Sequence, residues 1–120
     1  MPPLNIFEDR LPAEGDIRDK IMVTEKIQLK NKQAEGFVIP LGSLNLVCVV
    51  TDIGLAGCGA FDVSALGNFN YPAVKVRSAT GFPIATIENL LAGIVKEANA
   101  GAEKLGICIG MTGREALDLM

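Results

Sequence analysis

The fold is decided by a short apolar run at residues 44–50, LNLVCVV. Its apolar side chains fall on both faces of an extended chain, which is typical of a strand that is covered on both sides. Before it, residues 21–30 alternate between apolar and polar side chains, which predicts a half-exposed strand. Polar residues 31–33 suit a hairpin turn, and the return strand begins at residues 37–41. Pro40 must then lie at an edge or at the end of that strand, because proline cannot donate to the ladder.

The chain after this run predicts shorter elements. Residues 52–54 suit a turn, and GCGAF (57–61) is expected to return as a strand whose small residues allow close approach. Asp62 is a good N-cap for a helix that runs through Leu66 and stops at residues 67–68. Further strands are expected at residues 74–78 and 107–109.

A longer helical pattern follows. Thr86 is expected to cap a segment with helical apolar spacing up to residue 98, interrupted at Gly93 and continuing to Leu105, where Gly106 stops it. Together these elements predict an α+β fold: a small mixed, largely antiparallel sheet with short C-terminal helices packed on it.

The composition points to assembly. The chain has 120 residues, enough for one domain, and it is 49% hydrophobic but only 5% aromatic. So small a domain has too much surface to hide that many aliphatic side chains, so we expect a homo-oligomer. A single apolar pocket is the competing interpretation.

Charge excludes two classes of partner. The net charge is -3 and the lysines and arginines are scattered, which argues against nucleic acid and against an anionic membrane surface. No apolar run approaches the roughly 20 residues of a spanning helix. Residues 1–20 contain three prolines and no clear period, so we expect an N-terminal arm or irregular leader before a single domain at residues 21–120. These residues lack the features of a signal peptide, and we expect a cytoplasmic protein.

Histidine is absent, which excludes Ser-His and Cys-His nucleophile pairs and every His-ligated metal site. The three cysteines, Cys48, Cys58 and Cys108, form no C-x-x-C pair and are interpreted as small buried hydrophobic side chains in a reducing compartment. We expect neither a metal nor a cofactor.

GMTGREAL (110–117) carries the candidate site. Thr112 and Glu115 fit a capping box, and Gly110 and Gly113 allow a sharp turn. Arg114 is unexpected there, because a cation faces the positive end of the helix dipole. Two interpretations are open. In the first, Arg114 pairs with a carboxylate, which belongs to Asp52, to Asp62 or to a neighbouring subunit. In the second, the helix start, Thr112 and Arg114 together bind a small anion.

Cys58 is the candidate nucleophile, four residues before the Asp62 cap and flanked by glycines. A buried structural thiol is the simpler interpretation, because no histidine can act as its base. Asp52 and Asp62 are explained by turn and cap roles, and two carboxylates are too few for a calcium site. GLAGCGAFD (54–62) has the wrong glycine order for a dinucleotide loop.

Two of these motifs are similar to a known family. CGAFDV (58–63) and LGICIGMTGREAL (105–117), with TIENLL (86–91), resemble the YunC-like domain of unknown function of bacteria and archaea. The resemblance covers residues from about 21 to 120. It implies an α+β domain whose N-terminal strands mediate assembly, with tetramers expected, and it carries no catalytic residue over.

The sequence therefore favours a non-catalytic homo-oligomeric module that binds a small anionic metabolite at residues 110–115, with Thr112, Gly113, Arg114, Cys58 and Asp62 as candidate ligand-binding residues. The alternative is a small enzyme that uses Cys58 or a carboxylate, with Arg114 holding an acidic substrate.

Overall fold

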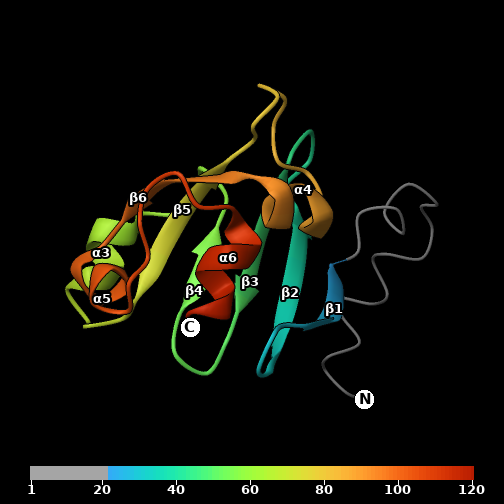
Figure 1. Ribbon diagram of the computed structural model, residues 1–120. Helices are drawn as coiled ribbons and strands as arrows, with labels where there is room; N and C mark the ends of the chain where they lie inside the picture. The colour runs from blue at the N-terminus through green and yellow to red at the C-terminus, as the bar shows by residue number, and fades with distance from the viewer. Residues whose placement is uncertain (1–21) are drawn as a thin grey trace, which may run out of the picture.

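Six strands lie side by side in the order in which the chain makes them (Figure 1). The computed structural model describes residues 22–120. The strands are β1 (Val23–Gln28), β2 (Gln33–Pro40), β3 (Asn45–Val50), β4 (Leu55–Gly57), β5 (Ala73–Arg77) and β6 (Ile94–Ala98). Every neighbouring pair is antiparallel except β4 and β5, which are parallel. The predicted mixed, largely antiparallel sheet is confirmed, and Pro40 is the last residue of its strand.

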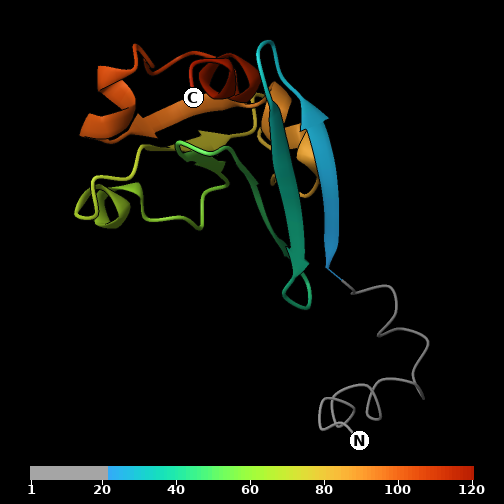
Figure 2. The same ribbon diagram turned by 90° about the horizontal axis from the view of Figure 1, so that it is seen from below.

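Within residues 22–120, four short helices cover the two faces of this sheet: α3 (Val63–Gly67), α4 (Ile87–Ala92), α5 (Ala100–Lys104) and α6 (Gly113–Asp118). Figure 2 shows α3 on one side of the sheet and α6 on the other. The side chain of Asp62 accepts a hydrogen bond from the backbone N–H of Ala65, so Asp62 caps α3 as predicted. α3 provides the crossover that a parallel strand pair requires.

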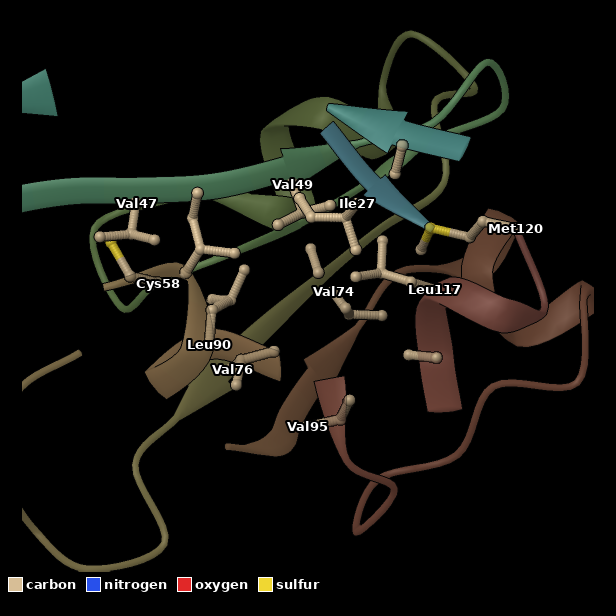
Figure 3. Close-up of a cluster of buried hydrophobic side chains, with 14 of the residues drawn as sticks. Ile27, Val47, Val49, Cys58, Val74, Val76, Leu90, Val95, Leu117 and Met120 are labelled. Atoms are coloured by element: carbon tan, nitrogen blue, oxygen red, sulfur yellow. The ribbon is translucent and has the colours of Figure 1, made fainter. Parts of the chain in front are cut away.

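The main core lies between the sheet and the helices α4 and α6 (Figure 3). It contains Val47 and Val49 of β3, Leu90 of α4 and Leu117 of α6, and all four side chains are fully buried. Cys48, between the two valines, is buried as well. Since neighbouring residues of a strand point to opposite faces, β3 is covered on both sides, as its sequence predicts.

The predicted helix beyond Gly93 is wrong. Residues 94–98 form strand β6, in which Val95 pairs with Val76. Gly93 ends α4 in an extended conformation, and a Cβ at this position would lie 2.5 Å from a methyl carbon of Val76. The chain therefore leaves the helix at Gly93 and runs along β5. Asn99 then caps α5, and Gly106, with φ +94°, follows its end as expected.

Two further expectations are corrected. GCGAF does not form a strand: β4 ends at Gly57, and the N–H of Phe61 donates to the carbonyl of Cys58 across a turn. The Phe61 ring lies over Gly57, where a Cβ would come within 2.4 Å of it. Residues 107–109 are also no strand. The segment 107–112 instead follows β6 through hydrogen bonds between Val95 and residues 110 and 111.

The four helices are short, and no helix within residues 22–120 has the length and apolar character needed to cross a membrane. The N-terminal arm expected at residues 1–20 lies outside the described part of the chain.

Candidate functional site

The start of α6 has the predicted capping box. Thr112 Oγ1 accepts from the N–H of Glu115 at 3.1 Å, and Glu115 Oε1 accepts from the N–H of Thr112 at 2.9 Å. Gly110, with φ +102°, supplies the turn before it. Two of the backbone donors at this helix start are therefore used inside the motif.

Gly113 has a steric role. It is buried, and its N–H donates to the carbonyl of Gly93 at 2.9 Å. A Cβ added here would lie only 2.2 Å from the carbonyl oxygen of Leu90. The absence of a side chain thus lets α6 pack directly against the backbone of α4.

Arg114 reaches the first hairpin. Its Nη1 donates to the carbonyl of Gln28 at 3.2 Å, at the end of β1. A second contact lies beside it, where the N–H of Lys30 donates to Asp118 Oδ1 at 2.9 Å. A cation in the first turn of α6 is thus compensated by a carbonyl acceptor 86 residues earlier in the chain.

The two carboxylates considered as partners of Arg114 have other contacts. Asp52 Oδ1 lies 2.6 Å from Lys32 Nζ, which also donates to the carbonyl of Met120 at 2.6 Å. The hydrogen bond from Lys32 lowers the pKa of Asp52. Asp62 caps α3. A carboxylate on a neighbouring subunit, or a bound anion, stays a prediction for Arg114.

Cys58 lies far from Arg114. It borders a groove at the opposite end of the sheet from Gln28, the residue that Arg114 contacts. The groove has a volume of about 1010 Å³ and is bordered by residues 42–45, 58–60, 75–78, 81–85 and 96–97. Two of these segments are the β2–β3 loop and the loop before α4, which project from the same end of the sheet (Figure 1). Cys58 borders the groove with only 6% of its surface exposed.

Three cations and one carboxylate border this groove. Lys75 and Arg77 lie on the same face of β5, because they are two residues apart in a strand. The register between β5 and β6 shifts after Lys75, which pairs with Glu97, and Lys96 is the extra residue of β6 at this irregularity. Lys75 Nζ lies 3.6 Å from Glu97 Oε2, so these two charges offset each other.

Cys58 and Arg114 are not brought together. Cys58 donates its N–H to Val47, which pairs with Val38, whereas Gln28 pairs with Gln33. The strand positions next to Arg114 and Cys58 are thus Gln33 and Val38 of β2. These are five residues apart, roughly 16 Å at about 3.3 Å per residue. Asp62 does not border the groove either.

The cysteines differ in environment. Burial raises the pKa of Cys48, and the neighbouring Cys58 thiol raises it further. Cys108 is exposed, so the expectation that all three are buried is wrong for this one. Among residues 22–120, no three cysteine, aspartate or glutamate side chains gather closely enough to hold a metal ion.

The three cations of the groove were not predicted from the sequence. The alternation in VKVRS (74–78) places Lys75 and Arg77 on one face and was the available signal. The third cation, Lys96, could not be placed without knowing that residues 94–98 form a strand.

The mixed sheet and the short helices packed on it define a small α+β domain. The chain belongs to the family DUF1805, described as a domain of unknown function. The family matches residues 57–120. This family and the YunC relative described next together confirm the resemblance to the YunC-like domain.

Two relatives extend the similarity towards the N-terminus. The chain is 32% identical to the uncharacterized protein YunC of Bacillus subtilis (strain 168) over 91 residues, which are 76% of this chain and 89% of that protein. It is also similar to the crystal structure of TA1206, a protein of unknown function from Thermoplasma acidophilum. The TM-score is 0.72 at 26% identity, covering 82% of this chain and 91% of the other. None of these relatives has an assigned activity.

Proposed function

We propose that this protein is a non-catalytic homo-oligomeric module that assembles through its N-terminal strands. The observation that carries the proposal is the apolar surface at the start of β1. Met22 and Val23 are 48% and 51% exposed, and within residues 22–120 no strand pairs with the outer edge of β1. An open edge with apolar neighbours is a template for pairing with another chain.

A second copy of the same chain fits this edge. Pairing of β1 with β1 across a two-fold axis would continue the antiparallel sheet and would bury the same residues on both subunits. The tetramer expected from the family resemblance would need a second contact, for which the half-buried Phe37 and Ile39 of β2 are candidates.

Binding of a small anionic metabolite at residues 110–115 belongs to the same proposal, with the Arg114 guanidinium as its cation. The support is modest, because the N–H groups of Thr112, Gly113 and Glu115 are used inside the protein. The alternative enzyme is less well supported, because Cys58 and Arg114 lie at different ends of the sheet. A cytoplasmic location is also proposed, since free thiols are typical of a reducing compartment.

Light scattering coupled to gel filtration tests the assembly. We expect wild type to elute at a multiple of its 12.7 kDa mass at micromolar concentration, and Val23→Lys to lower that mass while its far-UV circular dichroism is unchanged. Ile109→Lys is the matched control, because Ile109 is an exposed apolar residue outside β1. Ile27 is unsuitable, because it is buried within the subunit.

A wild-type monomer of 12.7 kDa would refute the proposal. So would a Val23→Lys variant with the wild-type mass, or dissociation by Ile109→Lys alone.

A further inference from the structure

We propose that the groove beside β5 and β6 binds a small amphiphilic anion: a carboxylate or phosphate group attached to an apolar body. This site is separate from the start of α6 and from the assembly surface. It rests on three features of the groove, which are its unbalanced positive charge, the position of one guanidinium, and an apolar wall that is partly exposed.

The charge of the groove is opposite to that of the whole chain. The chain carries a net charge of -3, whereas the groove is bordered by Lys75, Arg77, Lys96 and Glu97. The pair between Lys75 and Glu97 leaves two cations in excess. Neither Arg77 nor Lys96 has a carboxylate within 4 Å among residues 22–120. A cleft lined by one sign of charge concentrates ligands of the other sign.

The exposed guanidinium of Arg77 lies beside the turn 58–61. A Cβ added at Gly59 would lie 3.5 Å from Arg77 Nε and 3.7 Å from Cζ, so the planar group lies against the backbone of the turn 58–61. The central residues of this turn, Gly59 and Ala60, border the groove, and their N–H groups have no acceptor among residues 22–120. A guanidinium beside backbone N–H groups suits a carboxylate or phosphate, because both can accept several charge-assisted hydrogen bonds.

The remaining border of the groove is apolar. Ile84 is buried, while Phe82 and Leu44 are 74% and 55% exposed on the two loops that flank the opening. Exposed large apolar side chains beside a cavity are available to cover the apolar part of a ligand. The volume of about 1010 Å³ is at the upper end of the range for small-molecule sites, roughly 300–1,000 Å³. These features together suit a ligand with a charged end and an apolar body.

Isothermal titration calorimetry on the full chain tests this site with octanoate and octyl phosphate as probes. Acetate and inorganic phosphate lack the apolar body, and 1-octanol lacks the charge. We expect the two amphiphilic anions to bind at least tenfold more tightly than any of these three compounds. Amide chemical shifts should change at residues 59–60, 81–82 and 84–85.

Variants separate the groove from other cationic surfaces. We expect Arg77→Gln and Lys96→Gln each to weaken octanoate binding at least fivefold, and Lys104→Gln, an exposed lysine on α5, to leave it unchanged. Phe82→Ser should weaken octanoate binding without affecting acetate. Circular dichroism of each variant establishes that it is folded, and Lys96→Gln serves alone if Arg77→Gln does not fold.

The site would be overturned by the absence of binding of either amphiphilic anion at millimolar concentration, by equal binding to wild type and both groove variants, or by equal weakening in Lys104→Gln. Loss of binding in Arg114→Gln alone would move the anion to the start of α6 and would also overturn it. The oligomer mass is measured in the same samples, so failure of the assembly proposal is detected separately.

Discussion

Replacing Gly113 with alanine should destabilise the protein, although alanine is the better helix former. In a helix interior, glycine is less favourable than alanine by about 1 kcal/mol. At this position a Cβ would lie 2.2 Å from the carbonyl oxygen of Leu90 and 3.2 Å from its carbon. An ordinary carbon–oxygen contact needs roughly 1 Å more. The obstacle is backbone, so no side-chain rotation can relieve the contact.

The magnitude follows from what must move. α6 has to shift from α4 by about 1 Å, which loosens the packing of buried Ala116 and Leu117 and stretches the hydrogen bond from Gly113 to Gly93. Overpacking of a core typically costs about 1–3 kcal/mol. Weakening of that hydrogen bond adds to this cost, and the gain in helix propensity offsets part of it, so we expect a net loss of about 2 kcal/mol. The melting temperature should fall by roughly 8 °C in a domain of this size.

Urea unfolding followed by circular dichroism measures the effect, at one fixed protein concentration because assembly contributes to stability. Gly59→Ala is the matched control. A Cβ at Gly59 would make only an ordinary contact with Arg77, at 3.5 Å, and we expect a change within about 0.5 kcal/mol. If Gly113→Ala is as stable as wild type, or if the control loses as much, the steric argument is wrong.

The remaining predictions concern the α6 cap, the thiols and one ion pair. Thr112→Ala should lower the free energy of unfolding by about 1 kcal/mol, because the cap is lost. Arg114→Gln should lower it by less, because it removes one exposed hydrogen bond. Urea titrations of both variants measure this, and a larger loss in Arg114→Gln than in Thr112→Ala would contradict it. One thiol per folded chain, that of exposed Cys108, should react rapidly with iodoacetamide, and rapid labelling mapped to buried Cys58 would favour the enzyme alternative. The lysine contact lowers the pKa of Asp52, so the stability linked to this carboxylate is present above about pH 4 and is lost as the pH falls through its lowered value. Asp52→Asn should therefore lose less stability than wild type between about pH 4 and pH 2. Parallel acid titrations of the two proteins measure this, and equal losses of stability would refute the assignment.

The sequence predicted those elements whose signals are local. The Thr112 capping box and the Asp62 cap depend on residues within three positions of each other, and both are present. The buried central strand was predicted because its apolar residues need cover on both faces, wherever that cover comes from.

Residues 94–98 could not be assigned from a local pattern. Ile94 and Val95 fit the apolar stripe of a helix and also the pairing surface of a strand, and short apolar runs do not distinguish the two. Pairing with β5 decides between them, and Gly93 permits it by allowing Val76 to come close. The groove was missed for the same reason, because it joins loops and strand ends that are distant in sequence.

The contacts of α4 also bear on how the chain can be divided. The family match begins at residue 57, yet Ile87 of α4 packs over Gly36 of β2, and Leu90 lies in one core with Val47 and Val49 of β3. A fragment cut at the start of the match would keep α4 and lose the strands that cover it. The stretch that identifies the family is thus shorter than the unit that folds, and a fragment made for expression or domain transfer has to begin ahead of β1.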